Sequence, residues 1–400
     1  MGTADDASAA PGSLYLDVTR LVHRWVRGIR PTGVDRVALA YVRRYAGQAG
    51  ALVSVRGLPI ALPTGASERM FRLLNGAGDM WSRGRRLRAL VPVLGATGVA
   101  LPSHSPQDGG TVLHTLHSGL EHGRYFRALH ARGARTVVMV HDLIPLTHPH
   151  YCVPSSVQRH ALRLQTVLRC ADGIVTNSQA TLDALAAYAG DNGLVMPPAT
   201  VARLGADVSP SGPVAQRSGR AYFVMIGTIE PRKNHWLILH LWRQLVTQWG
   251  NLAPQLVVIG RPGWKCGNEL DMLCQCPELQ DAVVHLPNCA DVDMLEQLRG
   301  ARALLFPSFI EGYGLPLVEA LAMGVPVIAS SLAVFREIAG EVPDYLDPLD
   351  GAGWLARIRS YAQSFSAERE QQLIRLAAFR WPTWSEHFAL LERFLGRVAR

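Results

Sequence analysis

The chain has 400 residues, which is too long for one ordinary hydrophobic core and suits two domains of roughly 150–200 residues each. Hydrophobic residues make up 48% of it, so the composition excludes a largely disordered protein. The net charge of +8 is unevenly divided, because residues 1–213 hold 22 Arg against 13 Asp and Glu, whereas the remainder is almost neutral. An excess of positive charge in the first half predicts an anionic partner there: a diphosphate-bearing substrate, anionic lipid headgroups or nucleic acid.

The features that bear on localisation predict a cytoplasmic protein. The first dozen residues are small and polar and lack the apolar core of a signal peptide. The longest apolar run, residues 89–102, is interrupted by Pro92 and two glycines and falls short of the about 20 residues that a spanning helix needs. The six cysteines are scattered, with a single C-x-C at Cys274 and Cys276, so we expect reduced thiols and no structural metal site.

Short apolar runs alternate with helical patterns along the chain. Seven runs have the character of buried parallel strands, at residues 14–18, 136–140, 173–176, 221–226, 255–259, 303–306 and 326–329. An apolar stripe at helical spacing over residues 34–45 follows the first of them. This alternation predicts an α/β protein with parallel sheets covered by helices on both faces.

A stretch rich in Pro, Gly and Ser at residues 210–219 divides the chain nearly in half. It predicts a first domain over residues 1–213 and a second over residues 219–383, each a doubly wound, Rossmann-like unit. In such folds ligands bind at the carboxyl ends of the strands, so we expect a cleft between the two domains to hold the functional site.

Residues 307–320, PSFIEGYGLPLVEA, place Glu311 and Glu319 on either side of a glycine-bearing loop and a helix start. Gly312 and Gly314 let the backbone approach a ligand closely, and free N–H groups at a helix start near Pro316 favour anions, so this loop is predicted to bind phosphate. The glutamates are expected to contact different parts of one extended ligand, whereas a glycosidase pair flanks one bond at roughly 5–9 Å. We expect Glu319 to bind a ribose and Glu311 a sugar.

A second motif, IGTIEPRKNH at residues 226–235, follows another predicted strand. Arg232 and Lys233 lie where they would neutralise a diphosphate. Of the 40 basic residues only Lys233 and Lys265 are lysines, which favours a functional role for Lys233. Lys265, after the next strand, is equally compatible with a role in the cleft and with an ordinary surface position.

Two further patterns allow more than one interpretation. His141 and Asp142 follow the strand at 136–140, where a residue of the cleft would lie, but they also fit a structural histidine beside a helix-capping aspartate. Asp291 and Asp293 form a D-x-D of the kind that binds manganese. Because apolar residues follow them at helical spacing, we instead expect Asp291 to be a helix N-cap and predict no metal site.

Taken together, IGTIEPRKN, HLPNCADVDMLEQLRGARALLFPS and SFIEGYGLPLVEALAMGVPVIAS closely resemble the nucleotide-binding half of retaining GT-B glycosyltransferases of glycosyltransferase family 4. The pair E-x7-E, here Glu311 and Glu319, is the hallmark of that family. The resemblance is dense over residues 135–340 and weak over the first 130. It implies a GT-B fold, with two Rossmann-like domains facing across a cleft and the C-terminal helix, here residues 384–400, crossing back to the first domain.

The resemblance also implies roles for individual residues. Glu319 would hold the donor ribose, Glu311 the donor sugar, and Arg232 and Lys233 the leaving diphosphate, while His141 would contact a donor-sugar hydroxyl. The other residues expected to bind the donor lie in the same motifs or close to them: Gly227, Thr228, Gly260, Asn288, Gly312, Tyr313, Gly314 and Leu315. Many members carry an arginine where this chain has Thr228, and Arg232 is expected to supply that charge.

The predicted activity is transfer of mannose or a related hexose or deoxyhexose with retained configuration, without a metal or other cofactor. GDP-mannose is the donor that the resemblance suggests first. The acceptor would be a glycan or lipid-linked oligosaccharide in surface-polysaccharide assembly, bound by the first domain. Gly33, Arg36 and His117 are candidate acceptor contacts, although ordinary loop packing explains each equally well.

The basic first domain also predicts peripheral contact with an anionic membrane on its inner face, with residues 83–88 as the densest cluster of arginines. Nucleic acid is disfavoured as a partner because aromatic residues do not alternate with these arginines. Two alternatives remain: a GT-B relative that acts as a nucleotide-sugar epimerase or phosphorylase, and a nucleotide-binding protein without catalysis.

Overall fold

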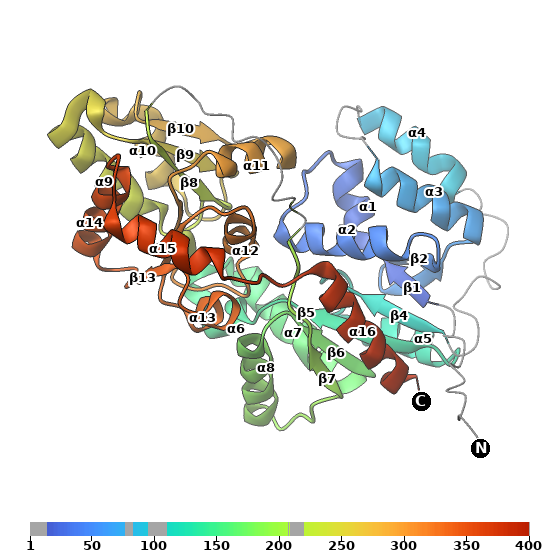
Figure 1. Cartoon of the computed structure of the whole chain (residues 1–400). Helices are drawn as coiled ribbons and strands as arrows, with labels where there is room; N and C mark the ends of the chain where they lie inside the picture. The colour runs from blue at the N-terminus through green and yellow to red at the C-terminus, as the bar shows by residue number, and fades with distance from the viewer. Residues whose placement is uncertain (1–13, 77–82, 95–109, 207, 209–219, 400) are drawn as a thin grey trace, which may run out of the picture.

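A computed structural model describes residues 14–76, 83–94, 110–206, 208 and 220–399. The described chain forms two α/β units that face each other, with strands inside and helices outside (Figure 1). None of the helices in these ranges has the length and apolar character needed to cross a membrane.

The first unit is built on a seven-stranded sheet in the order β3-β2-β1-β4-β5-β6-β7. All neighbouring strands are parallel except β2 and β3, which form an antiparallel hairpin at one edge. The strands are β1 (Leu14–Asp17), β2 (Ala49–Val55), β3 (Leu58–Ala61), β4 (Thr111–His114), β5 (Arg135–Val140), β6 (Gly173–Thr176) and β7 (Ala199–Val201). The helices are α1 (Thr19–Val26), α2 (Gly33–Tyr45), α3 (Thr64–Asn75), α4 (Arg83–Leu94), α5 (Gly123–His130), α6 (Ile144–Thr147), α7 (Pro154–Cys170) and α8 (Gln179–Asp191).

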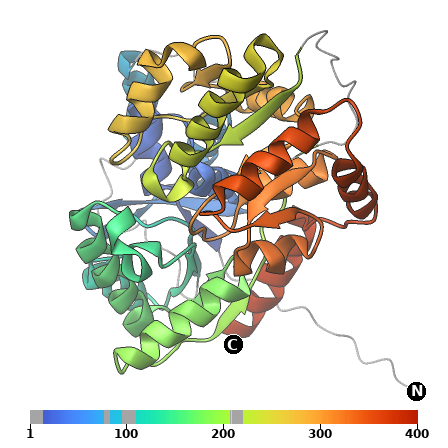
Figure 2. The ribbon, with the colours of Figure 1, turned by 90° about the vertical axis from the view of Figure 1, so that its left-hand side faces the viewer.

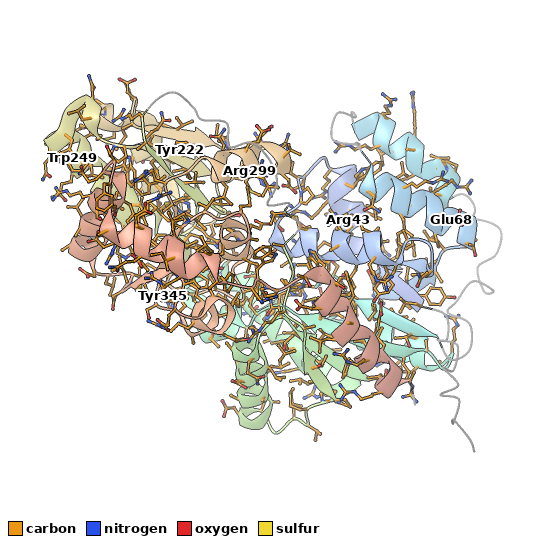
Figure 3. The ribbon with its side chains drawn as sticks, viewed as in Figure 1. Arg43, Glu68, Tyr222, Trp249, Arg299 and Tyr345 are labelled. Atoms are coloured by element: carbon orange, nitrogen blue, oxygen red, sulfur yellow. The ribbon has the colours of Figure 1, made fainter. Side chains whose placement is uncertain are left out.

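The second unit is built on a six-stranded, wholly parallel sheet in the order β10-β9-β8-β11-β12-β13. The strands are β8 (Tyr222–Ile226), β9 (Gln255–Ile259), β10 (Val283–Leu286), β11 (Leu304–Phe306), β12 (Val327–Ser330) and β13 (Asp344–Leu346). The helices are α9 (His235–Trp249), α10 (Gly267–Gln275), α11 (Asp291–Arg299), α12 (Leu315–Ala322), α13 (Ala333–Ala339), α14 (Gly351–Ala362) and α15 (Ala367–Ala377). The Tyr222 hydroxyl donates to the Gln297 carbonyl (2.8 Å) and so ties α11 to the start of β8 (Figure 3).

The strand orders determine where each unit has its crevice. In the second sheet the order reverses between β8 and β11, and in the first it reverses between β1 and β4. At such a reversal the following helices leave on opposite faces of the sheet, which opens a crevice at the carboxyl ends of the strands. The loops after β8 and β11 therefore meet at one place, opposite the loops of the first unit.

The final helix, α16 (Trp384–Val398), returns to the first unit and lies beside β7 (Figures 1 and 2). A capping box at Thr383 and Glu386 starts it, after Pro382 has interrupted the chain. Phe388, Leu391 and Phe394 form its buried face. The predicted crossing of the C-terminal helix is thus confirmed, as is the GT-B arrangement of two doubly wound domains.

All seven strands expected from the sequence are present, with ends within a residue or two of those predicted. The strands that were missed are short or only partly apolar, as β7 and β13 show, whose residues are all partly exposed. The predicted helix after Ala290 also exists, but Ala290 is its N-cap and Asp291 is its first residue, so the prediction that Asp291 caps it was off by one position. The linker predicted at residues 210–219 and the N-terminal tail lie outside the described residues.

The contact of α16 with the first domain centres on a buried histidine. His387 is fully buried, and its Nδ1 lies 3.1 Å from the carbonyl oxygens of Ala202 and Arg203. The Tyr41 hydroxyl lies 2.8 Å from Nε2. Since a carbonyl can only accept, Nδ1 carries the proton and Nε2 accepts from Tyr41. Burial lowers the pKa of His387 to about 4, so the ring is neutral in the folded protein at pH 7.

We therefore expect the free energy of unfolding to fall as the pH drops from about 6.5 to about 4, by on the order of 2–3 kcal/mol from this residue. In that window the unfolded chain binds a proton on His387 and the folded chain does not. Urea denaturation at several pH values should show a flatter profile for His387→Gln than for the wild type. His122→Gln, at an exposed position, is the control; parallel profiles for the wild type and His387→Gln would contradict this account.

Candidate active site

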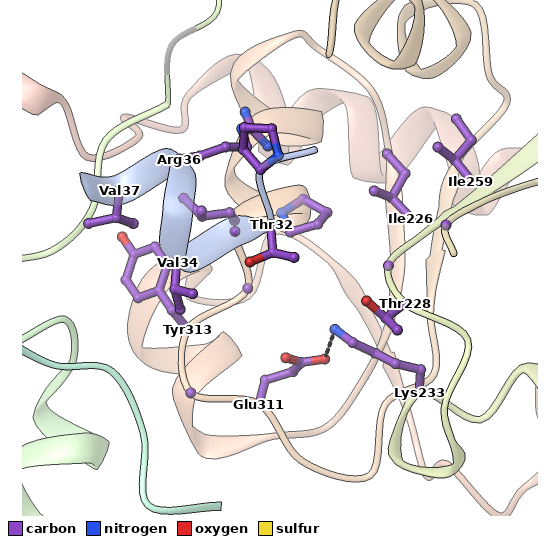
Figure 4. A pocket seen from close by; sticks show the side chains of 18 of the residues that line it. Thr32, Val34, Arg36, Val37, Ile226, Thr228, Lys233, Ile259, Glu311 and Tyr313 are labelled. Atoms are coloured by element: carbon purple, nitrogen blue, oxygen red, sulfur yellow. Dashed lines mark hydrogen bonds and ion pairs between the residues drawn. The ribbon is translucent and has the colours of Figure 1, made fainter. Parts of the chain in front are cut away.

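A cavity of about 390 Å³ lies between the two domains, at the carboxyl ends of their strands (Figure 4). The predicted site residues that line it are Gly33, Arg36, His141, Gly227, Thr228, Arg232, Lys233, Gly260, Glu311, Gly312, Tyr313, Gly314 and Leu315. Residues from α2 form one wall, and the ends of β8 and β9 with the loop after β11 form the facing wall. The fold thus brings most of the predicted residues together around one space.

A cluster of buried charges occupies the middle of this cavity. Lys233 ends a single 3-10 turn (Pro231–Lys233) after β8, and its Nζ forms an ion pair with Oε1 of Glu311, which follows β11 (Figure 4). Arg232 Nη1 lies 3.0 Å from the other carboxylate oxygen of Glu311, and its Nη2 lies 2.7 Å from Glu230. The Ser308 hydroxyl also donates to Glu311 (2.7 Å). The two motifs recognised separately in the sequence are therefore joined by direct contacts.

These contacts determine the protonation of the cluster. Burial raises the pKa of Glu311, but the charges of Lys233 and Arg232 outweigh it and lower that pKa to about 2. For Lys233, burial lowers the pKa against the opposing effect of Glu311. For Arg232, burial also acts to lower the pKa, yet Glu311 and Glu230 hold it above its ordinary value. Glu311 is consequently ionised at neutral pH and lies between two cationic side chains.

The loop after β11 approaches the first domain very closely at Gly312. A Cβ atom at this position would lie 2.6 Å from the His141 carbonyl oxygen and 2.7 Å from Cβ of Asp142. The Gly312 carbonyl accepts from the hydroxyls of Ser178 and Thr181 (both 3.3 Å). Only glycine permits the two domains to meet here, because any side chain would have to displace backbone atoms.

Gly314 and Leu315 then begin helix α12. Gly314 is the N-cap with φ of 111°, a conformation that favours glycine, and Pro316 follows within the first turn. Gly314, Leu315 and Pro316 of this turn line the cavity, and the N–H groups of Leu317 and Val318 donate to the Gly314 carbonyl (3.0 and 3.3 Å). Tyr313 turns away, since its hydroxyl donates to the Leu204 carbonyl of the first domain (2.7 Å). Its side chain is therefore a contact between the domains.

Glu319 is almost completely buried, at 1% exposure, and lies behind the cavity wall formed by the start of α12. Its Oε1 forms an ion pair with Nη2 of Arg36, which comes from α2 of the first domain. Arg36 Nε also lies 3.5 Å from Asp291. Arg36 was suggested by the sequence as an acceptor contact, but the structure places it against the glutamate expected to bind the donor ribose.

His141 lines the cavity and is 3% exposed. Its Nε2 lies 2.8 Å from the Thr115 carbonyl oxygen, so this nitrogen carries the proton, and Nδ1 is left as an acceptor. Burial lowers the pKa of His141, which makes the neutral form the relevant one at pH 7. Its expected contact with a sugar hydroxyl would therefore be one in which the hydroxyl donates.

Besides Glu319, two predicted residues do not line the cavity. His117 packs edge-on against His141 (ring centroids 5.4 Å apart) and against His160 (5.8 Å), so it supports His141 from behind. Asn288 lies next to Pro287 and Cys289, which do line the cavity. Arg30, Asn177 and Arg261 also line the cavity, although the sequence did not single them out as individual site residues. Their positions depend on how the two domains face each other.

The cavity differs in character from one end to the other. Charged groups surround Lys233 and Glu311, where the central strands β8 and β11 end. Toward the edge strand β10, the lining becomes largely apolar, formed by Ile226, Ile259, Leu286, Pro287 and Met294. A cavity of this kind suits an elongated ligand with an anionic middle and a flat, partly apolar end.

Comparisons with known proteins agree with this fold. Residues 212–343 match the family described as Glycosyl transferases group 1. The whole chain aligns with the structure of Anabaena Alr3699/HepE in complex with UDP-glucose with a TM-score of 0.63 and 14% identity, covering 97% of this chain and 98% of the other. The chain therefore has the GT-B fold, and within its second domain residues 212–343 match the glycosyl transferases group 1 family.

Two bacterial proteins are also similar to this chain in sequence. The serotype-specific mannosyltransferase WbdA of Escherichia coli is 30% identical over 294 residues, which cover 68% of this chain and 35% of WbdA. O-antigen chain mannosyltransferase B of Escherichia coli is 30% identical over 243 residues, covering 57% of this chain and 61% of the relative. The chain thus spans only about a third of the length of WbdA.

Replacing Glu311 by Gln should destabilise the protein, because it leaves Lys233 and Arg232 buried without their shared carboxylate. We expect the free energy of unfolding to fall by about 3–5 kcal/mol at pH 7. The folded pKa of about 2 lies below the ordinary value of 4.5, so the stabilisation by Glu311 is complete above pH 4.5 and is lost as the pH falls toward 2. The difference in the free energy of unfolding between the wild type and Glu311→Gln, measured by urea denaturation, should accordingly become smaller over that pH range.

Glu230→Gln is the matched control for this measurement, because Glu230 contacts Arg232 and is more exposed than Glu311. At pH 7, Glu230→Gln should lower the free energy of unfolding by less than Glu311→Gln does. A gap between the wild type and Glu311→Gln that stays constant down to pH 3 would show that Glu311 is not held ionised by its two cations.

Proposed function

We propose that this protein is a retaining, metal-independent glycosyltransferase. It would move mannose or a related hexose from a nucleotide-diphosphate sugar to a glycan or lipid-linked oligosaccharide in surface-polysaccharide assembly. The observation that carries the proposal is the meeting of Arg232, Lys233 and Glu311 in the cleft between the domains, at the crevice of the second sheet. The sequence relatives named for mannose transfer support the sugar class.

In the proposed reaction the bond between the anomeric carbon and the β-phosphate oxygen breaks, and negative charge builds on the departing diphosphate. Arg232, Lys233 and the N–H groups at the start of α12 are the groups that would stabilise this charge. They are already fixed by the fold, so little reorganisation is needed during the reaction. The acceptor hydroxyl forms the new bond to the anomeric carbon and passes its proton to the departing diphosphate oxygen.

Glu311 would contact the donor sugar and hold the two cations in place. It is a poor candidate for a covalent nucleophile, because Lys233, Arg232 and Ser308 all bind its oxygens and its pKa is about 2. We therefore favour attack from the face that the diphosphate leaves, which gives retention without a glycosyl-enzyme intermediate. His141, with its accepting Nδ1, would orient a sugar hydroxyl from the first domain.

Glu319 would accept hydrogen bonds from the donor ribose. Arg36 already pairs with this carboxylate, so the ribose must share Glu319 with Arg36 or displace it. In either case, binding of a nucleotide to the second domain would change the contact that Arg36 of the first domain makes with Glu319. Binding of the donor and the approach of the two domains would then be linked.

The first domain would hold the acceptor and contact the membrane surface. Helix α4 exposes Leu87 and Val91 (46% and 67%) next to the exposed Arg85 and Arg88. A helix that combines exposed apolar and basic side chains fits the interface of an anionic bilayer. The protein would then act at the cytoplasmic face of the membrane as a peripheral enzyme.

A thermal-shift screen tests the donor class. GDP-mannose is the expected donor, and at 100 times its Kd it should stabilise the folded protein by about 2.7 kcal/mol. UDP-, dTDP- and CMP-sugars are the comparison set. A shift with one of these instead would replace the donor, and the absence of a shift with every nucleotide sugar would contradict the proposed function.

Lys233→Met tests the role of the cationic pair in the reaction. We expect turnover with the true donor and an acceptor glycan to fall by about two orders of magnitude or more, since a charge-stabilising group is lost. Lys265→Met removes the only other lysine, lies outside the cavity lining, and should change turnover little. Equal effects of the two substitutions would contradict the assignment. The anomeric configuration of the product, read by NMR, separately tests retention.

A further inference from the structure

The loop that joins α1 and α2 of the first domain contributes to the cavity. Arg30, Pro31 and Thr32 of this loop line the cavity, although they belong to the domain opposite the nucleotide motifs. Arg30 Nη1 is buried and has no hydrogen-bond partner among the residues that the structure describes. A buried guanidinium nitrogen without a partner is costly, so it points to a ligand that completes the site.

The segment that carries Arg30 faces the end of the cavity beside β10. Arg36 follows this segment in α2, and its Nε lies 3.5 Å from Asp291, which comes after β10 and lines the cavity together with Cys289. Cys289 follows β10 and lines the cavity beside Leu286 and Pro287. If the diphosphate of a donor lies at Lys233 and the ribose near Glu319, the flat apolar end beside β10 is left for the base.

Several contacts hold this loop in place, so the guanidinium of Arg30 can recognise a ligand group. Asp35, 1% exposed, accepts from Nε of Arg20 (2.9 Å) and from the backbone N–H of Thr32 (2.8 Å), and it pairs with Arg24 (2.9 Å). Nη2 of Arg24 in turn donates to the Arg30 carbonyl (2.6 Å). These contacts fix both ends of the short segment that carries Arg30, so its side chain is presented to the cavity in a defined direction.

From this placement we propose that Arg30 is a specificity-determining residue for the donor base and selects guanine. A guanidinium presents two parallel donors, and guanine offers two adjacent acceptors, N7 and O6, at matching spacing. Uracil and thymine present a single carbonyl oxygen at the corresponding edge, and cytosine presents a donor there. The inference rests on the proposed function, since it assumes that a nucleotide donor occupies this cavity.

The main competing occupant is a phosphate group. Arg261, which follows β9 in the second domain, also lines the cavity, so arginines from both domains contribute to its lining. A phosphate between them would gain from both charges regardless of the base. A nucleotide base is favoured over a phosphate as the group that Arg30 contacts. The surrounding wall is apolar, and Arg232 and Lys233 already provide the diphosphate site.

Calorimetric titration with GDP, 7-deaza-GDP and UDP distinguishes these cases. The 7-deaza analogue keeps the base shape, the ribose and the diphosphate but lacks the N7 acceptor. The wild type should bind GDP about five-fold more tightly than 7-deaza-GDP. It should bind GDP at least about ten-fold more tightly than UDP. Arg30→Met should bind GDP and 7-deaza-GDP equally, with its Kd for UDP changed less than about three-fold.

Arg27→Met is the matched control, since Arg27 is an exposed arginine three positions earlier. It should keep the wild-type preference for GDP, and thermal melting should show that both variants fold. Equal weakening of GDP and UDP by Arg30→Met would assign Arg30 to phosphate and overturn the inference, as would a 7-deaza penalty that persists in Arg30→Met. If the wild type binds none of the nucleotides, the proposed function itself fails; if it binds UDP best, only the inference on guanine fails.

Discussion

The site depends on burying three charges together. An isolated ion moved from water into a protein interior loses several kcal/mol of hydration, and this loss is recovered only with close, well-oriented partners. Glu311 has such partners in Lys233, Arg232 and Ser308, and Lys233 also lies over the ring of Phe306 (5.0 Å from its centroid). The cluster therefore keeps two cations buried beside a carboxylate that they share, whereas a lysine and an arginine without such a partner would be costly to bury.

This arrangement also explains how the cleft would accept a diphosphate without collapsing in its absence. Glu311 acts as a built-in counterion, and a second anion would bind beside it in the field of the same cations. Because Glu311 is held from three sides, it does not need to leave when that anion arrives. The local dielectric is low, so the cations act more strongly on a bound phosphate than they would in water.

Polar contacts grouped around the cleft join the two domains, in addition to a buried apolar cluster that includes residues of both. Glu337 of the second domain accepts from the backbone N–H groups of Gln179 and Ala180, at the first turn of α8 in the first domain. A carboxylate at this position satisfies two donors that the helix itself leaves unpaired and interacts favourably with the helix dipole. With the contacts of Arg36 and Gly312, it sets the spacing of the two walls.

The sequence predicted the second domain better than the first, and the reason is physical. In the second domain the functional residues follow strands directly, as Lys233 follows β8 and Glu311 follows β11, so strand patterns and motifs locate them together. The strands β2, β3 and β4 in the first domain, by contrast, had no signal strong enough to separate them from loops. The family resemblance supplied the expected role of His141, which residue patterns alone left open.

What the sequence could not supply is the pairing across the cleft. Arg36 was recognised as a residue of interest, yet nothing in its local sequence indicates a partner 283 positions away. Likewise, Arg30 is one of many arginines, and it becomes distinctive only when its buried nitrogen faces a cavity whose other wall belongs to the second domain. Both residues come from the domain that resemblance assigns to the acceptor, but both lie against the part of the cavity where a donor nucleotide would bind. A donor held by both domains would be bound fully only when they close, so closure would assemble the catalytic site and commit the donor in one step.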